Sequence, residues 1–573
     1  MDFQKLVDVY EELENTPSGN KMREILSEFF KKVPKEDLPT LTYLTLGQIS
    51  SDYEGVVLGM AEKTALKAIS IAGGVDSSKV RRLIKEKGDA GLVAEEIIKH
   101  KSQTLIPLKK LTMHDLFNGL HKIAEASGSG SQDVRINTLA SMLQRSSSKG
   151  AKYLVRIALG TLRMGVGDMT VLDSLAIAFT GEKKNKEFLE RAFNICPDVG
   201  VIAELIANKG LKGVDNVEIK VGRPIKMMMG QRVKELEEVQ KKIPGPLTIE
   251  AKYDGERIQA HKDSKGKINL FSRRLDNITK QFPDLVEYLD KAIQQKEFIV
   301  EGEVVAVDKE GHNLPFQVLM QRRRKYDVEE YVKKIPIHFN VFDLLYLNGK
   351  SYLHEAYYKR ADKLESIVHK NKEVKLTERI ITEDLEEVDA FFHKMLDEGY
   401  EGIFIKSRAE DSEYQAGVRG WNWIKWKKEY VKEMVDTFDL VIVGAFYGKG
   451  KRHGVYGALL CASYNESEDT FETVCKLGTG LTDEVLEDLP KKLKKYQVPK
   501  KTARLSIKKE MTPDVWFSPN IVVEVLAAEI TKSPFHTCAG GLALRFPRFL
   551  QFRENKKAEQ SNTSKELRDL FEK

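Results

Sequence analysis

The spacing of apolar residues changes near residue 217, and this change limits the fold more than any other feature of the sequence. Up to about Asn216, apolar residues recur at helical spacing and strand-like alternation is sparse. Beyond that point the apolar segments are short and alternating, with Gly and Asn between them, as in 298–307 and 337–346. The sequence therefore predicts an all-helical part followed by an antiparallel α+β part.

The length of the chain predicts further division. A chain of 573 residues is too long for one ordinary core, so we expect three or four domains. After about residue 432, further strands and a basic, Gly-rich loop at 447–457 are typical of a small β-barrel, and a short charged helix ends the chain. We place the domains at 1–216 (helical), 217–431 (α+β) and 432–573 (β-barrel with a final helix).

Composition narrows the class of protein. The net charge of +6 is modest, so a polyanionic partner is allowed but not demanded. Four scattered cysteines without CxxC spacing favour neither a zinc ribbon nor a disulfide framework. The charged start and the lack of a long apolar run predict an intracellular, cytoplasmic protein with no membrane segment.

Local signals in the helical part predict helix starts. Thr112 with Asp115, and Thr170 with Asp173, have the spacing of N-caps that open helices. The link at 127–132, SGSGSQ, opens onto another helix. Free backbone amides at a helix start suit a phosphate, although an ordinary Ser/Gly loop is favoured on this feature alone.

Three cations that follow this link leave two interpretations open. Lys152, Arg156 and Arg163 could contact phosphate. Equally, they could belong to a solvated helix face.

The segment Leu247–Arg257, LTIEAKYDGER, is the candidate centre of function. Apolar and polar residues alternate up to Lys252, which ends the predicted strand, and Asp254-Gly255 then turns the chain. This position offers the Lys252 side chain to a ligand, as a lysine nucleophile requires. A surface lysine beside a hairpin turn explains the same letters, and the local pattern does not decide between the two.

Several other segments carry groups that suit phosphate chemistry. Glu301 and Glu303 share one face of a strand, and carboxylates there suit a cation, a ribose or a metal. The remaining candidates are a third acid, four cations and a mid-strand aromatic: Glu401, Lys406, Arg419, Lys425, Lys427 and Phe342. Each of these residues alone could have a purely structural role, in the core or on the surface. Together they supply the acids, cations and aromatic ring that nucleotidyl transfer needs, because that catalysis depends mainly on positioning the substrate and neutralising phosphate charge.

The order of these blocks resembles a known family. The segments EAKYDGER, SRRLDNIT, EGEVVAVD, FDLLYLNG, EGIFIKS, WIKWKKEY and RFPRFLQFREN follow the pattern of ATP-dependent DNA ligases of the archaeal and eukaryotic type. In the helical part, KGDAGLVAE, SGSGSQ and RIALGTLRMG match the DNA-binding domain of that family. The resemblance covers almost the whole chain.

The resemblance implies a helical DNA-binding domain, an α+β adenylation domain and a C-terminal OB-fold that close around nicked double-stranded DNA. It implies ATP as cofactor with Mg²⁺, Mn²⁺ being an alternative, and nick sealing in replication, repair, recombination and cell division. A monomer is expected.

The resemblance also assigns roles to residues. Lys252 would carry covalent AMP, Glu250 would accept from the adenine amine and Phe342 would stack on the adenine. Glu303 and Glu401 would hold the metal. Ribose or phosphate contacts would come from Arg257, Arg273, Glu303, Lys406, Arg419, Lys425 and Lys427, and pyrophosphate would be oriented by Arg553 and Lys556.

Some features leave alternatives open. Asn555 stands where the family usually has Asp, which leaves the part played by that position in the first step undetermined. The segment Gln103–Ile106 fits the loose spacing of a sliding-clamp-binding peptide, but Leu105 and Ile106 fit a helical core equally well. The rival functions are an RNA ligase or capping-type nucleotidyltransferase, an NAD-dependent ligase, and a catalytically silent nick-binding protein.

Overall fold

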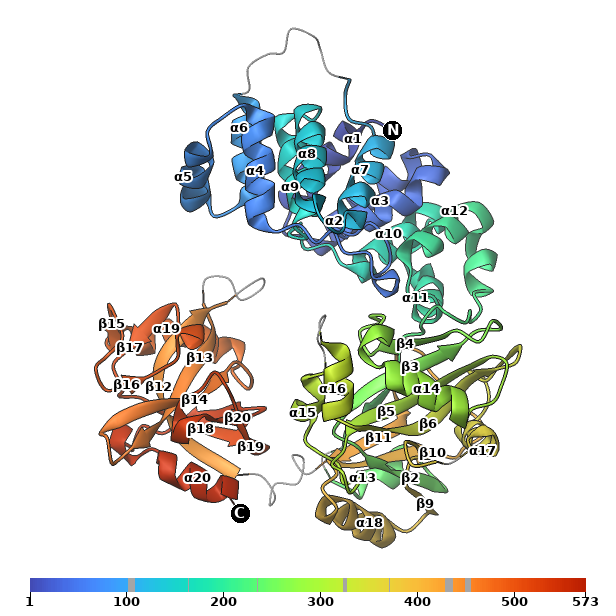
Figure 1. The fold of residues 1–573 in the computed structure, drawn as a ribbon, viewed down its shortest axis with the longest axis vertical. Coiled ribbons are helices and arrows are strands. Elements are labelled where there is room, and N and C mark those ends of the chain that lie inside the picture. The colour runs from blue at the N-terminus through green and yellow to red at the C-terminus, as the bar shows by residue number, and fades with distance from the viewer. Residues whose placement is uncertain are drawn as a thin grey trace. The chain divides into compact units, whose positions relative to one another are not determined.

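A computed structural model describes residues 1–100, 109–162, 164–233, 235–322, 327–369, 371–427, 436–448 and 455–572 (Figure 1). The chain forms two compact units. One comprises Met1–Gln231, Ile243–Glu383 and Ile405–Ile424, and the other comprises Arg232–Lys242, Asp384–Phe404 and Lys425–Lys573.

The first part of the chain is helical, as its apolar spacing predicts. Its helices are α1 (Phe3–Glu14), α2 (Gly19–Lys32), α3 (Leu38–Thr45), α4 (Glu62–Gly73), α5 (Ser77–Lys87), α6 (Ala90–Lys99), α7 (Met113–Glu125), α8 (Ser131–Gln144), α9 (Ser148–Ala158), α10 (Asp168–Thr180), α11 (Lys186–Ile195) and α12 (Val199–Asp215). The apolar faces of these helices share one core. Among the described residues, none of the helices combines the length and the apolar character that crossing a bilayer needs.

One predicted helix start is confirmed and the other is wrong. Thr112 and Asp115 form a reciprocal capping box at the start of α7. By contrast, α10 begins at Asp168, so Thr170 and Asp173 lie inside the helix. There the Asp173 carboxylate pairs with Arg23, 2.5 Å away on α2, because a buried acid needs a cationic partner.

Lys152 and Arg156 occupy neither a solvated face nor a phosphate site. Both side chains of α9 are largely buried against α1. The Lys152 ammonium lies 3.0 Å from Glu11 and 2.5 Å from Glu14. The Arg156 guanidinium lies 2.8 Å from Glu14 and 3.3 Å from Asp89. Lys152 and Arg156 therefore fasten helices together, and both interpretations of the sequence are wrong for them. Arg163 lies outside the described residues.

The α+β part contains two sheets. The first has the strand order β1 (Met229–Gln231), β11 (Arg419–Lys427), β10 (Gly402–Ser407), β2 (Leu247–Lys252) and β9 (Arg379–Thr382). The second has the order β4 (Ile268–Ser272), β3 (Glu256–Lys262), β5 (Phe298–Ala306), β6 (Ile337–Leu347) and β7 (Lys350–Ser351), with β8 (Val374–Leu376) also pairing with β6. The β3–β4, β3–β5 and β5–β6 pairings are antiparallel, as predicted.

The α+β part also contains helices, which are labelled in Figure 1. They are α13 (Glu238–Lys242), α14 (Pro283–Ala292), α15 (Phe316–Met320), α16 (Val328–Lys334), α17 (Tyr357–Ile367) and α18 (Leu385–Asp397). Apolar residues of α14 and α17 share one buried cluster with β3, β4, β5 and β6. The strands β3, β5 and β6, which carry Arg257, Glu303 and Phe342, are therefore anchored by apolar packing.

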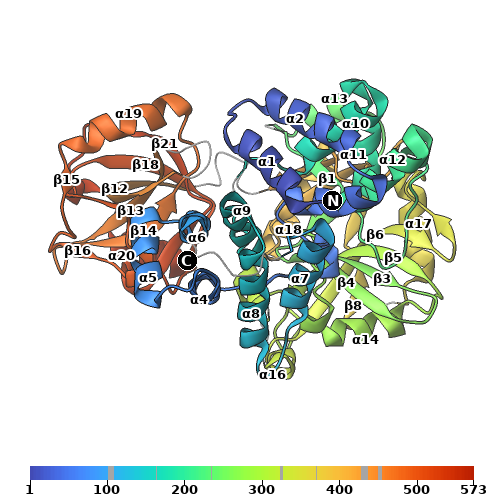
Figure 2. The same ribbon diagram turned by 90° about the horizontal axis from the view of Figure 1, so that it is seen from above.

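The C-terminal part is a sheet with the strand order β15 (Gln497–Val498), β17 (Val515–Phe517), β12 (Asp436–Tyr447), β13 (Tyr456–Asn465), β14 (Thr470–Leu477) and β16 (Leu505–Ser506). It continues through β18 (Val522–Ala527) to β21 (Arg548–Phe552), while β19 (Glu529–Lys532) pairs with β20 (Leu542–Arg545). The helices are α19 (Asp483–Lys494) and α20 (Ser564–Glu572), and α19 lies beside β21 (Figure 2). The predicted fold class, helical then α+β then OB-type barrel, is confirmed.

The ion pairs between α1 and α9 should make stability depend on acid pH. Burial acts to raise the pKa of Glu14, but hydrogen bonds from Lys152, Arg156 and Tyr153 prevail and lower it to about 2. A depressed folded-state pKa stabilises the fold above the unfolded value and loses that stabilisation as pH falls. Unfolding free energy should therefore decrease from about pH 5 toward pH 2, and Glu14→Gln should flatten this decrease in circular dichroism melts.

Removing one cation of the same cluster should be costly at neutral pH. Arg156→Met leaves carboxylates without their partner and should lower the unfolding free energy by about 2–3 kcal/mol. Lys184→Met is the matched control, because Lys184 pairs with Glu182 on the exposed surface and should change stability by less than about 0.5 kcal/mol. Equal effects of the two substitutions would contradict a structural role for Arg156.

Candidate active site

Lys252 is the last residue of β2, immediately before the turn into β3. The turn needs glycine at position 255, because a Cβ there would lie 2.2 Å from the carbonyl oxygen of Val304 on β5. The Lys252 side chain is half-buried, and its Nζ lies 3.4 Å from the carbonyl oxygen of Tyr253. The predicted strand end and turn are thus present, with Lys252 at the end of an interior strand of the sheet.

Glu250 lies two residues earlier on β2 and is only 2% exposed. Its carboxylate Oε2 is 2.5 Å from Nζ of Lys406 on β10. Its Oε1 accepts a hydrogen bond from the Tyr357 hydroxyl of α17. The carboxylate is therefore held by a cation and a hydroxyl from two other elements.

Lys406 is enclosed by aromatic rings. Its Nζ lies 4.4 Å from the ring centroid of Trp423, 4.5 Å from that of Tyr357 and 4.9 Å from that of Phe342. Burial lowers the pKa of Lys406, while the Glu250 carboxylate acts to raise it. The ring faces also favour the charged ammonium, so the contact with Glu250 is an ion pair in an aromatic cage.

The acids of β5 have different surroundings, although the sequence places both on one face. Glu301 is fully buried, and it accepts from Arg257 at 2.5 Å, Gln259 at 3.0 Å and Tyr414 at 3.0 Å. Glu303 is half-buried and lies opposite Arg257 in the β3–β5 register. Glu301 is therefore a structural partner of Arg257, and Glu303 is the acid of the two with the greater exposure.

Arg257 and Phe342 lie together. The Arg257 guanidinium carbon is 5.2 Å from the centroid of the Phe342 ring, and Nη1 donates to the Met228 carbonyl at 2.7 Å. Phe342 packs edge-on against Trp423, with ring centroids 6.3 Å apart. An aromatic ring with a fixed cation beside it suits a nucleotide, whose base stacks and whose phosphates are anionic.

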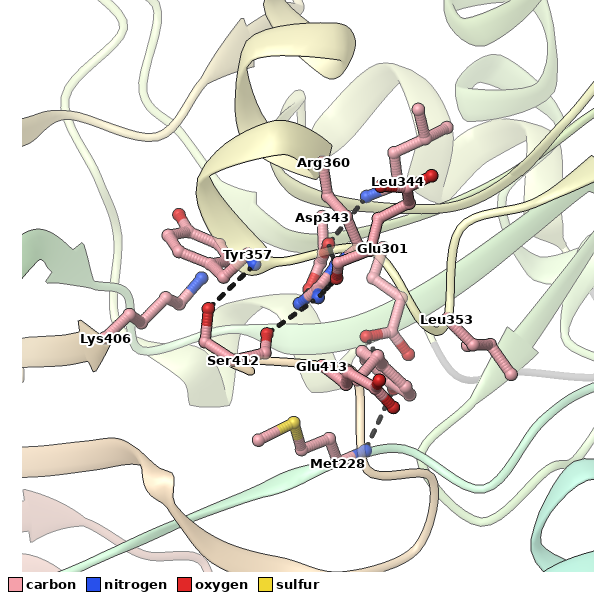
Figure 3. Close-up of polar contacts among 12 residues, drawn as sticks. Met228, Glu301, Asp343, Leu344, Leu353, Tyr357, Arg360, Lys406, Ser412 and Glu413 are labelled. Atoms are coloured by element: carbon pink, nitrogen blue, oxygen red, sulfur yellow. Dashed lines mark hydrogen bonds and ion pairs between the residues drawn. The ribbon is translucent and has the colours of Figure 1, made fainter. Parts of the chain in front are cut away.

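A buried charge network holds this region and was not predicted from the sequence. Arg360 of α17 donates to both carboxylate oxygens of Asp343 on β6, at 2.8 and 3.0 Å, and both side chains are fully buried (Figure 3). Arg360 also donates to the Ser412 carbonyl at 3.1 Å, and the Ser412 hydroxyl accepts from the backbone N–H of Tyr357 at 3.0 Å. A lone acid within the apolar run of β6 was the available signal, because such an acid needs a buried partner.

Arg273 and Arg419 flank the same strand, β1. Nη2 of Arg273, just beyond β4, lies 3.6 Å from Sδ of Met229. Arg419 begins β11 and is the register partner of Met229. Both side chains are exposed, so these two predicted cations lie near one another at the surface.

The remaining candidates belong to the second compact unit. There Glu401 forms an ion pair with Lys427, and Lys425 lies half-buried on β11. Lys556 lies 2.5 Å from Asp439, and Arg553 lies 3.7 Å from Asp439 and 3.4 Å from Glu524. Arg553 and Lys556 also line a cavity of about 750 Å³ that contains lysines of α19 and its C-terminal end, namely Lys491, Lys492, Lys494 and Lys495.

The residues present fit a hard divalent metal only in part. Among the described residues, no group of three or more His, Cys, Asp or Glu side chains is arranged to hold a metal ion. Mg²⁺ commonly uses one or two carboxylates together with substrate phosphates and waters. Glu303 and Glu401 have the right chemistry for that mode of binding.

Comparisons with known proteins agree over the whole chain. Residues 2–176 match the family described as DNA ligase N terminus, 227–427 match the ATP dependent DNA ligase domain, and 452–556 match the ATP dependent DNA ligase C terminal region. DNA ligase 2 of Thermofilum pendens is 45% identical and is aligned over 100% of this chain and 97% of its own. DNA ligase 1 of Methanosarcina mazei is 42% identical, over 100% and 99%.

The chain belongs to the ATP-dependent DNA ligase family, of the archaeal type. A solved structure named "Pmar-Lig_Pre." shares the fold, with 17% identity, a TM-score of 0.57 and coverage of 96% of this chain and 99% of that chain. The resemblance seen in the sequence is therefore confirmed, and so is the expectation of an enzyme of the ligase class. The clamp-binding segment Gln103–Ile106 lies outside the described residues and stays a prediction.

The buried Asp343–Arg360 pair should dominate the stability of the adenylation region. Asp343→Asn leaves the Arg360 guanidinium without its counter-charge, and we expect the unfolding free energy to fall by about 3–5 kcal/mol in urea titrations followed by tryptophan fluorescence. Asp362→Asn is the control, because Asp362 is exposed on α17, the helix that carries Arg360. It should change the unfolding free energy by less than about 0.5 kcal/mol. A small effect at Asp343 would show that the pair does not hold α17 on the sheet.

Proposed function

We propose that this protein seals nicks in duplex DNA, with ATP as the source of the adenylyl group and Lys252 as the nucleophile. The observation that carries the proposal is the position of Lys252 at the end of β2, beside the glycine-requiring turn and within a family of ATP-dependent DNA ligases. ATP use follows from the family, and the metal and the roles of single residues are part of the proposal.

The reaction has three steps in this proposal. The neutral Lys252 amine attacks the α-phosphorus of ATP, a P–N bond forms, and the bond to pyrophosphate breaks. An oxygen of the 5′-phosphate at the nick then attacks the AMP phosphorus and frees Lys252. Finally the 3′-hydroxyl attacks that 5′-phosphate, loses its proton, and AMP leaves as the backbone bond closes.

The nucleotide would be held by the residues around Lys252. Glu250 accepts from the adenine amine and Phe342 stacks on the base, because their surroundings combine a fixed acceptor with an aromatic face. Contacts to ribose and phosphate are assigned to Arg257, Arg273, Glu303, Arg419, Lys425 and Lys427. Glu303 and Glu401 are assigned as carboxylate ligands of Mg²⁺, or of Mn²⁺ in its place, and the metal would supply neutralisation of phosphate charge.

The pyrophosphate would be oriented by Arg553 and Lys556. In the structure these cations pair with Asp439 and Glu524, so binding a phosphate requires them to exchange an acid for the substrate. Asn555 lies between Arg553 and Lys556 in the sequence. Because its side chain is uncharged, it does not compete with an anionic ligand for these two cations. Pyrophosphate leaves in the first step, so we confine their role to that step.

The remaining proposals concern partners and boundaries. Binding to nicked DNA should rest on phosphate contacts and weaken with salt, without sequence preference.

We propose a cytoplasmic monomer with the helical DNA-binding domain at 1–216, the adenylation domain at 217–431 and the OB-fold domain at 432–573. The peptide Gln103–Ile106 remains a candidate site for a sliding clamp.

Replacing the nucleophile tests the proposed function directly. Purified protein incubated with ATP should gain the mass of one AMP, and peptide mapping should place it on Lys252. Lys252→Ala should gain none and should fail to seal nicked DNA with ATP, while Lys262→Ala, at the end of the next strand, should behave as wild type. An AMP adduct on Lys252→Ala, or sealing of nicked RNA in preference to DNA, would refute the proposal.

The step-specific role of the OB-fold cations needs a separate experiment. Arg553→Ala should slow self-adenylation by about tenfold or more, because a charge-assisted contact to the leaving group contributes about 1.5–3 kcal/mol. Sealing of a nick that already carries 5′-AMP should continue near the wild-type rate. Full-rate self-adenylation together with loss of sealing would mean that Arg553 acts on DNA instead.

A further inference from the structure

The buried carboxylate of Glu250 has two polar contacts, an ion pair and a hydrogen bond. Lys406 Nζ lies 2.5 Å from one oxygen, and the Tyr357 hydroxyl donates to the other. Lys406 comes from β10 and Tyr357 from α17, so neither partner belongs to the strand that carries Glu250. A 2%-exposed carboxylate reached from two sides has little freedom to turn.

The cage around Lys406 keeps this contact ionic. Lys406 is 1% exposed, and three aromatic rings have their centroids within 4.9 Å of its Nζ. The faces of these rings attract a desolvated ammonium, and the adjacent carboxylate adds the attraction of a buried ion pair. The ammonium and the carboxylate therefore stabilise each other in their charged forms.

Tyr357 is held just as firmly. Its backbone N–H donates to the hydroxyl and to the carbonyl of Ser412, each at 3.0 Å. One turn further along α17, Arg360 forms an ion pair with Asp343 of β6 (Figure 3). The start of α17 is thus tied to the sheet and to a neighbouring loop, which fixes the direction of the Tyr357 hydroxyl.

We propose that Lys406 and Tyr357 are positioning residues that hold Glu250 as an acceptor-only carboxylate, and that this arrangement selects a purine with an amino group at position 6. An ionised carboxylate accepts hydrogen bonds and donates none. A 6-amino group supplies the donor that it needs, whereas a 6-oxo group presents a second acceptor and is repelled. This role replaces the ribose or phosphate contact that the sequence predicted for Lys406.

The proposal rests on the proposed function and makes it more specific. Without the ammonium, the Glu250 carboxylate would keep only its contact with the Tyr357 hydroxyl, so it would no longer be held in one orientation. An acceptor free to turn away would discriminate less strongly between a 6-amino and a 6-oxo purine. The substitution that matters is therefore on β10, far from Glu250 in the sequence.

The experiment compares ATP with inosine triphosphate, which carries a carbonyl in place of the 6-amino group. The readout is kcat/KM for formation of the covalent lysyl-nucleotide with each. Wild type should prefer ATP, and Lys406→Met should reduce the ATP-to-ITP ratio about tenfold or more, as expected for a hydrogen bond to a charged group. Tyr357→Phe should reduce the ratio by a smaller factor and keeps the ring volume.

A double substitution separates positioning from a general structural effect. If Lys406 acts through Glu250, then Lys406→Met combined with Glu250→Gln should have the same ratio as Glu250→Gln alone. Lys359→Met on α17, an exposed residue paired with Glu410 at 2.7 Å, should leave the ratio at its wild-type value.

Two results would overturn the proposal. One is an equal loss of rate with both nucleotides in Lys406→Met and Tyr357→Phe, which leaves the ratio unchanged. The other is an additive loss of selectivity in the double variant. Wild type that forms no lysyl-AMP at all would instead refute the proposed function, so the two failures are distinguishable.

Discussion

Buried carboxylates, each paired with one buried or half-buried cation, set the geometry of the adenylation region. Glu250 pairs with Lys406, Glu301 with Arg257 and Asp343 with Arg360, and the carboxylate side chains are no more than 3% exposed. Each ion loses its hydration on burial, and only a close partner offsets that loss. The cations therefore cannot move away independently, and the polar face around Lys252 is fixed before any nucleotide binds, which is the condition for electrostatic preorganisation.

A register irregularity in β6 brings these pairs and the aromatic side of the site together. Phe342 and Asp343 are neighbours on β6, and the β5–β6 pairing skips Phe342 between the partners of Glu301 and Gly302, so one strand supplies both a stacking ring and a buried acid. Trp423, 2% exposed, packs edge-on against Phe342, Tyr357 and Tyr414. The rings and the ion pairs thus occupy one interior, and a change to either should disturb the other.

What the sequence predicted well depends on short-range geometry. The strand that ends at Lys252, the turn at Gly255 and the capping box at Thr112 each follow from residues within a few positions of one another. The interpretations that failed depend on partners distant in the sequence. Lys152 and Arg156 meet acids of α1 and the loop before α6.

The orientation of Lys406 was equally beyond sequence reasoning. Its cage comes from β6, α17 and β11, and its counter-charge comes from β2. Periodicity predicts which face of a strand a lysine occupies. The residues that contact that face come from other elements, so periodicity does not predict them. Tyr357 was missed for the same reason, since a tyrosine at a helix start has no local feature that marks it as a donor to Glu250.

The same physics distinguishes the cations of the two units. Arg257 and Lys406 are 14% and 1% exposed, so separating them from their acids leaves a charge in a medium of low dielectric constant. Arg553 and Lys556 are 28% and 32% exposed, and water screens their pairs with Asp439 and Glu524. Exchange of an acid for a phosphate is therefore cheap in the second unit and costly in the first. Cations that exchange partners at low cost suit a leaving group that must be bound and then released. The buried pairs suit a nucleotide pocket that keeps its shape through every step.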